Sequence, residues 1–93
     1  MIRTFADRDT QSLFDRKRTR RFGHDVEKLA RRRLVMLDAA ETLNDLRVPP
    51  GNRLEKLRGD RSGQHSIRVN DQSRICFRWR SGDAFDVEIV DYH

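Results

Sequence analysis

The hydrophobic pattern of the chain changes its period at one place, Pro49-Pro50-Gly51. Before this segment, apolar residues recur at spacings of three and four, the period of an amphipathic helix. After it, apolar and polar residues alternate in three short stretches, the pattern of half-buried strands. Two prolines and a glycine end a helix. The chain is therefore expected to place its helices first and its sheet second.

The helical pattern predicts one long helix that begins with Asp25 as N-cap and runs to Leu43 or Leu46. A shorter helix is expected near the start of the chain, capped by Asp7 or Asp9. The apolar positions that define the two helices are Leu13, Phe14, Val26, Leu29, Ala30, Leu34, Leu37, Ala40 and Leu43.

Two further segments flank these helices. Ile2 to Phe5 is predicted to form a short first strand. Residues 16–24 contain five basic residues in the six positions 16–21 and little apolar material to anchor them. This segment is interpreted either as a solvated, mobile basic connection or as a contact for RNA or a protein partner.

Loop lengths set the expected strand register. A three-residue loop at 71–73 places Val69 opposite Ile75, and another at 81–83 places Trp79 opposite Phe85. One face of the three strands then becomes wholly apolar, whereas a shift by one residue mixes the faces. The opposite face pairs Arg74 with Val90 and Arg78 with Asp86, and sets Arg68, Cys76 and Glu88 in one row.

The predicted fold class is therefore α+β. One domain, residues 1–93, is expected to have a short N-terminal strand and two helices packed on a mainly antiparallel, twisted sheet. No internal repeat is visible.

The composition limits the cellular environment and the kinds of partner that are expected. The net charge of +5 and the pI of about 10.3 favour a polyanionic partner. The single cysteine, Cys76, permits no internal disulfide, which suits a reducing cytoplasm. No apolar run approaches the length of a membrane span, and the first residues turn polar at once, unlike a signal peptide. A cytoplasmic protein without membrane contact is expected.

The predicted register brings basic side chains near the end of the chain. Tyr92 shares the parity of Val90, so it is expected on the face of Arg74. His93 follows it, and the neighbouring basic side chains are those of Arg58, Arg68 and Arg78. RNA cleavage needs a cation at the phosphate, a base for the 2′-hydroxyl and an acid for the leaving oxygen. A solvated arginine face with a frayed chain end is the simpler interpretation.

Other chemistries lack a sequence signature. The chain has no glycine-rich phosphate loop, no zinc-ligand spacing and no strained serine elbow. His24 and His65 stand apart from other ligand types in the sequence. No metal and no other cofactor is expected.

Several segments together resemble the HigB toxins of the RelE-like superfamily, in that family's order across nearly the whole chain. Pro49-Pro50-Gly51-Asn52-Arg53-Leu54 is similar to the GraT branch. The segments that carry the resemblance are Met1-Ile2-Arg3-Thr4-Phe5, Arg53-Leu54-Glu55-Lys56-Leu57-Arg58-Gly59-Asp60-Arg61, Ser66-Ile67-Arg68-Val69, Arg74-Ile75-Cys76-Phe77 and Val90-Asp91-Tyr92-His93.

The resemblance implies a toxin of a type II toxin–antitoxin system that inhibits translation and growth. Such a toxin is a metal-independent endoribonuclease that enters the A site of the 70S ribosome and cuts mRNA there. The implied partner is a HigA-like antitoxin with a helix-turn-helix, and the implied contact with operator DNA occurs only through the toxin–antitoxin complex. The implied fold is compact and RelE-like.

The resemblance also implies site residues. Arg74 matches the strand arginine expected to bind the scissile phosphate, and Asp91, Tyr92 and His93 match the catalytic group at the chain end. Arg58 stands where a lysine is frequent and keeps the positive charge. The residues expected to bind RNA are Lys56, Arg58, Arg68 and Arg78.

Two positions depart from the family pattern. Glu55 stands where some relatives have a catalytic histidine, so it either serves as the base or pairs with a nearby arginine. Ser73 stands where tryptophan is common, and the lost aromatic side chain is expected to weaken packing or base stacking near the site. Two alternatives therefore stay open: a non-catalytic module that binds RNA or the ribosome, and an attenuated toxin retained as an antitoxin-binding partner.

Overall fold

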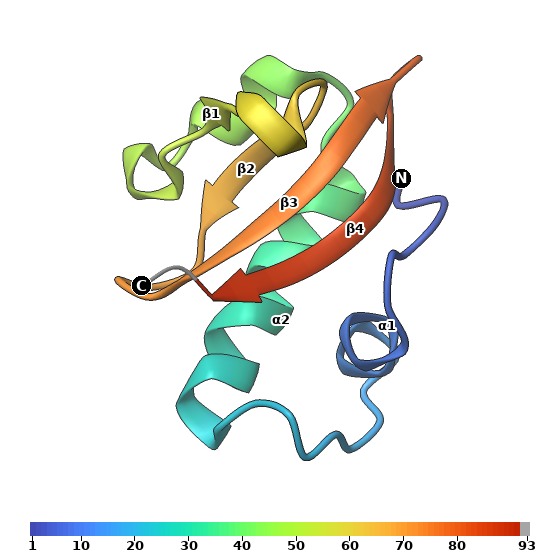
Figure 1. Ribbon diagram of the computed structural model, residues 1–93, viewed down its shortest axis with the longest axis vertical. Coiled ribbons are helices and arrows are strands. Elements are labelled where there is room, and N and C mark those ends of the chain that lie inside the picture. Colours follow the sequence, from blue (N-terminus) through green and yellow to red (C-terminus); the bar gives the residue numbers. More distant parts are fainter. Residues whose placement is uncertain (92–93) are drawn as a thin grey trace.

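The computed structural model describes residues 1–91, and its main elements form two layers, with the two α-helices on one side of a four-stranded sheet (Figure 1). The α-helices are α1 (Arg8–Phe14) and α2 (His24–Ala39), and three 3-10 helices follow: η1 (Leu43–Arg47), η2 (Pro50–Asn52) and η3 (Gly59–Arg61). The strands are β1 (Glu55–Lys56), β2 (His65–Arg68), β3 (Ser73–Arg80) and β4 (Asp83–Asp91).

The sheet is antiparallel throughout, in the order β1-β2-β3-β4. The predicted first strand is present only as two isolated parallel bridges beside β4, Ile2 with Ala84 and Phe5 with Val87. The α+β class, with two helices on a mainly antiparallel sheet, is thus confirmed.

The core lies between the sheet and α2, on what we call the helix face. The sheet contributes Ile67, Ile75, Phe77 and Ile89 to it, and all four side chains have no exposed surface. The partners from the helices and η1 are Leu13, Ala30, Leu34, Leu37 and Leu46, also without exposed surface. Alternate residues of each strand point to the opposite side, which we call the outer face. Residues 57–64, including η3, lie over part of this outer face (Figure 1).

The two α-helices match the prediction in number but not in all boundaries. Asp7 caps α1, because its carboxylate accepts the backbone N–H of Thr10 at 2.7 Å. The predicted start and end of the long helix are wrong. Gly23, not Asp25, is the N-cap of α2, and Asp25 lies in its first turn, where a negative charge favours the helix dipole.

The long helix ends at Ala39 because the chain starts a new element there. Ala40 adopts extended backbone, and Thr42 and Asp45 form a reciprocal capping box for η1. The Asp45 carboxylate also accepts the backbone N–H of Glu41 at 2.9 Å. These bonds hold Leu43 and Leu46, predicted to end the long helix, in η1 instead.

The β2–β3 register differs from the prediction by two residues. Ile67, not Val69, lies opposite Ile75, and the loop is Asn70–Gln72 rather than 71–73. The Asn70 side chain explains the shift, because its carbonyl accepts the backbone N–H groups of Gln72 and Ser73 at 2.9 and 2.7 Å. An even shift preserves the faces, so the apolar side chains still meet α2. The outer row is therefore Ser66, Cys76 and Glu88, and Arg68 lies opposite Arg74.

The β3–β4 register is correct from Arg74 opposite Val90 to Cys76 opposite Glu88, and then breaks at a bulge. Asp86 is the extra residue of β4, with a φ of 52°. Beyond it Trp79 faces Ala84 and Arg78 faces Phe85, so the predicted pairing of Trp79 with Phe85 and the predicted loop at 81–83 are wrong. The predicted contact between Arg78 and Asp86 is present, as an ion pair at 3.5 Å.

The basic segment 16–24 has several anchors in this structure. The hydroxyl of Thr19 donates to Asp9 at 3.0 Å, and Arg21 donates to the carbonyl of Ile89 at 3.0 Å. Arg21 also pairs with Asp7 at 3.3 Å, and Phe22 packs against the core. Its mobility in solution stays a prediction. Within the part of the chain that is described, no helix is long and apolar enough to cross a membrane.

Candidate functional site

A cation with several fixed contacts on the outer face is the guanidinium of Arg74, whose side chain is 16% exposed. Its Nε donates to the hydroxyl of Ser66 at 2.8 Å, and its Nη2 donates to the backbone carbonyl of Arg53 at 2.7 Å. Ser66 is on the neighbouring strand and is fully buried. A planar guanidinium held by two such bonds has a fixed orientation. Arg74 is thus placed before any anion binds.

The carbonyl that holds Arg74 belongs to a braced segment. Arg53 ends η2 in left-handed backbone, with a φ of 45°. The preceding Asn52 is fully buried and donates from Nδ2 to the carbonyls of Leu46 and Val48, at 3.2 and 3.3 Å. Left-handed backbone is unfavourable for a residue with a side chain, so it persists only where surrounding contacts hold it. These contacts fix the Arg53 carbonyl beside Arg74.

A carboxylate lies next to this guanidinium. Glu55 is on β1, in register with Ser66, and its Oε2 is 3.8 Å from Nη2 of Arg74. Its side chain is 57% exposed, so it stays open to solvent and to a ligand. The contact with an arginine expected for Glu55 is present, and its role as a base stays a prediction.

One arginine is adjacent to Arg74, and others lie farther away. Arg68 is its direct neighbour on β2, and it also pairs with Asp71. Two like charges opposite each other on adjacent strands repel, and an anion placed between them relieves this repulsion. Arg58 is exposed at the start of η3, and Arg78 is two positions beyond Cys76 on the same face. The structure therefore brings Arg68 next to Arg74, and a common RNA-binding role with Arg58 and Arg78 stays a prediction.

Lys56 lies apart from this cluster. It pairs in register with His65, whereas Glu55 pairs with Ser66, so the two neighbours on β1 point to opposite faces. Burial lowers the pKa of His65, and the charge of Lys56 lowers it further. The structure thus groups Lys56 with His65 and not with Arg74.

Asp91 also lies on the opposite face of the sheet from Arg74. It ends β4 opposite Ser73, on the parity of the helix face, and the Ser73 hydroxyl donates to its carboxylate at 2.9 Å. Ser73, where the resemblance predicts tryptophan, is therefore bonded to the first residue of the segment that is predicted to be catalytic. Tyr92 and His93, predicted to complete the site, lie outside the described residues.

The sequence did not reveal how Arg74 is held. Ser66 was visible only as a polar position in a strand, and its register with Cys76 rather than its type brings it to Arg74. The Arg53 carbonyl has no side-chain signature at all. Among residues 1–91, no three His, Cys, Asp or Glu side chains gather where they could hold a metal ion.

Comparison with known proteins settles the family. The model of the HigB-like toxins, described as the RelE-like toxin of the type II toxin–antitoxin system HigB, matches residues 3–93. This chain belongs to the HigB-like toxin family. The match covers nearly the whole chain, so the predicted resemblance to the HigB toxins is confirmed.

Two HigB relatives illustrate the match. Toxin HigB-1 of Vibrio cholerae is 42% identical over 87 residues, which cover 92% of each chain. Endoribonuclease HigB of Proteus vulgaris is 33% identical over 94 residues and covers both chains completely. Among solved structures, the YoeB–YefM complex from Staphylococcus aureus contains a chain with a TM-score of 0.62 and 15% identity, covering 100% of this chain and 98% of that one. This likeness confirms the RelE-like fold of the HigB-like chain.

Proposed function

We propose that this HigB-like chain is an endoribonuclease toxin that cuts mRNA in the A site of the 70S ribosome and so inhibits translation and growth. Membership in the toxin family and the endoribonuclease among its relatives support the reaction class. The observation that carries the site is the prepositioned guanidinium of Arg74, with the Glu55 carboxylate 3.8 Å away. A cation and a neighbouring carboxylate are two of the groups that cleavage at a phosphate requires.

In this proposal Arg74 binds the scissile phosphate. Its bonds to Ser66 and Arg53 orient the guanidinium, so that a phosphate meets an aligned donor without reorganisation. As the bond to the 5′-oxygen breaks, Arg74 stabilises the additional charge on the phosphorane. Arg68 and Arg58 bind the flanking backbone, and Arg78 extends this basic surface along β3.

Proton transfer is assigned to Glu55, Tyr92 and His93. One of these groups removes the proton of the 2′-hydroxyl, and another protonates the leaving 5′-oxygen. No metal ion takes part in these steps in our proposal. Asp91 contributes by position, because its bond to Ser73 holds the end of β4 next to the loop between β2 and β3.

The proposed setting is the cytoplasm, where mRNA is translated. The proposed partners are the ribosome and a HigA-like antitoxin with a helix-turn-helix, and operator DNA is contacted only within the toxin–antitoxin complex. Family membership in a type II system and the fold neighbour solved in a two-protein complex support the antitoxin partner.

Mapping of mRNA cuts by primer extension in a reconstituted translation reaction tests the function. The wild-type protein is expected to produce cuts within translated codons, and none when ribosomes are omitted. Protein treated with EDTA and then desalted is expected to cut equally well. Arg74→Ala is expected to lose cleavage by at least about tenfold, because it removes a charged hydrogen-bond donor at the phosphate.

The matched control is Arg32→Ala, an exposed arginine on α2, on the other side of the sheet. It is expected to cut like the wild type. Blocked translation with intact mRNA would instead show a non-catalytic ribosome binder. Full growth without any antitoxin would show an attenuated toxin.

A further inference from the structure

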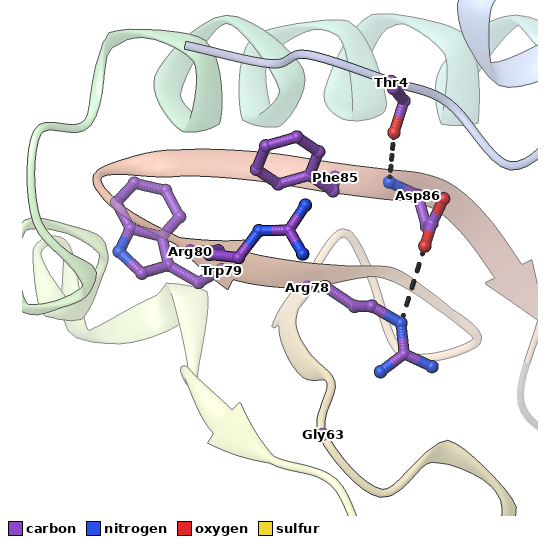
Figure 2. A pocket seen from close by; sticks show the side chains of 7 residues that line it. All are labelled: Thr4, Gly63, Arg78, Trp79, Arg80, Phe85 and Asp86. Atoms are coloured by element: carbon purple, nitrogen blue, oxygen red, sulfur yellow. Dashed lines mark hydrogen bonds and ion pairs between the residues drawn. The ribbon is translucent and has the colours of Figure 1, made fainter.

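A second basic site lies on the outer face, at the hairpin between β3 and β4. It is a pocket of about 390 Å³, within the range of about 300–1,000 Å³ typical of small-ligand sites. Arg78 and Arg80 reach it from the strand that also bears Arg74 (Figure 2). The lining residues are Thr4, Gly63, Arg78, Trp79, Arg80, Phe85 and Asp86.

The guanidinium of Arg78 has two neighbours in this pocket. Asp86 pairs with its Nε at 3.5 Å (Figure 2), and the backbone of Gly63 lies against its Nη1. A Cβ at position 63 would be 2.9 Å from that nitrogen, so the Arg78 side chain would have to shift, and the φ of 90° at Gly63 is a backbone conformation that favours glycine. Arg78 therefore lies between Asp86 and the loop that precedes β2, with its side chain 47% exposed to solvent.

The bulge in β4 supplies the aromatic part of the pocket. Because Asp86 is the extra residue, Phe85 lies opposite Arg78 on the outer face, and Ala84 takes the buried position. The guanidinium of Arg80 then lies over the Phe85 ring, 4.5 Å from its centroid (Figure 2). A phenylalanine that alternation assigned to the core thus forms a stacked pair with a cation at the surface.

We propose that this pocket binds one nucleotide of single-stranded RNA, with its phosphate on Arg78 and Arg80 and its base stacked on the pair formed by Arg80 and Phe85. Two guanidinium groups suit a phosphate, and an aromatic ring paired with arginine suits any base. An acidic peptide would use the same charges but would not need the ring. The aromatic component therefore favours RNA.

The proposed nucleotide site adds a substrate contact to the proposed mRNA-cleaving function, and it rests on that function. Arg78 is four residues from Arg74 on the same strand face, about 13 Å at strand rise. A nucleotide held here would belong to the strand that carries the scissile phosphate, so the pocket would help to set which bond reaches Arg74. The ion pair of Arg78 with Asp86 is solvent-exposed and weak, and a phosphate can replace it.

Intrinsic tryptophan fluorescence can report on this site, because Trp79 is the single tryptophan of the chain and lines the pocket. Titration of the full chain with a 5′-phosphorylated, 2′-O-methyl trinucleotide measures binding by Trp79 fluorescence without cleavage. A saturable change is expected for the wild type. Arg80→Gln and Phe85→Leu are each expected to weaken binding roughly tenfold, the size of one lost stacking or charged contact. Asp86→Asn, which removes the competing carboxylate, is expected to strengthen it.

Two controls separate this proposal from the proposed function. Arg74→Ala is expected to lower cleavage at least about tenfold and to leave the fluorescence titration within about twofold of wild type, since Arg74 does not line the pocket. If no saturable change occurs, or if Arg80→Gln binds like the wild type, the pocket proposal is wrong even where Arg74→Ala still lowers cleavage as expected. Equal binding of a hexaglutamate peptide would show a general anion site and would also overturn it.

Discussion

The hydroxyl of Ser73 donates a hydrogen bond to the carboxylate of Asp91, at 2.9 Å, across the pair that joins the start of β3 to the end of β4. Ser73 is 3% exposed, so this bond is shielded on the serine side. The segment that carries Tyr92 and His93 begins immediately after Asp91. Ser73 thus supplies a polar anchor at the root of that segment.

The anchor predicts different outcomes for two changes at Asp91. An asparagine can still accept the Ser73 hydroxyl with its amide oxygen, whereas an alanine cannot. Asp91→Asn is therefore expected to keep mRNA cleavage within a few-fold of wild type, and Asp91→Ala to lose about tenfold, equivalent to one hydrogen bond to a charged group. Single-turnover cleavage on programmed ribosomes measures both. Equal losses in the two variants would show that the charge of Asp91, not its position, matters.

A second prediction concerns the bond that orients Arg74. Ser66→Ala removes the acceptor of Arg74 Nε, and is expected to lower the free energy of unfolding by about 1 kcal/mol. Cleavage should fall less than in Arg74→Ala, because the guanidinium stays near the site but loses one of its two fixed bonds. Urea unfolding and primer extension give the two readouts.

A double mutant tests whether Ser66 acts through Arg74. If it does, Ser66→Ala adds nothing to the cleavage defect of Arg74→Ala, because residues that share one interaction are not additive. Additive losses in the double mutant would contradict this positioning role and point to a direct contact of Ser66 with RNA.

The part of the site that the sequence predicts correctly depends on the alternation of apolar and polar residues along the strands. Arg74 opposite Val90 and Arg78 beside Asp86 follow from period-two patterning of β3 and β4, and both are observed. The bulge at Asp86 was not predictable in this way, because Phe85, Val87 and Ile89 keep alternating across it. Only the small Ala84, which fits the buried position beside Trp79, hints that the strand gains a residue.

Hydrogen bonds made by the backbone or by loop side chains were also not predicted, because the apolar pattern does not report them. The Arg53 carbonyl meets Arg74 only because Asn52 braces the segment before β1. The helix boundary at Ala39 is set by the Thr42 capping box, which competes with the apolar period that continues to Leu43. In both cases a local polar contact outweighs a pattern that extends past it.

The hairpin turn gives a prediction on stability. Arg80 pairs with Asp83, so the turn residues are Ser81 and Gly82, with φ values of 52° and 81°. Two positive φ angles are typical of a type I′ turn, in which Asn-Gly is the preferred pair. Ser81→Asn is expected to stabilise the fold by about 0.5–1 kcal/mol and to raise Tm by a few degrees. Ser81→Val, with a branched side chain at positive φ, is expected to lower Tm.

The last prediction concerns pH and rests on His65. Its ring stacks on Phe77 with centroids 6.2 Å apart, and within the described residues its buried Nδ1 has no hydrogen-bond partner. Burial, and next the charge of Lys56, lower the pKa of His65 below its ordinary value of 6.5. The unfolded chain therefore binds a proton more readily than the folded one. The contribution of His65 to the free energy of unfolding is therefore fully present above about pH 6.5. It is lost as the pH falls from there through the lowered pKa of His65.

Urea unfolding at pH 7.5 and pH 5.5 measures this loss. His65→Gln is expected to remove most of the difference between the two conditions, because the replacement does not titrate. Lys56→Gln is expected to reduce it in part, since only the weaker of the two causes disappears. The carboxylates of Asp45 and Asp83 have pKa values below their usual 3.8, so they titrate outside this window. A pH dependence unchanged in His65→Gln would assign the effect to another group.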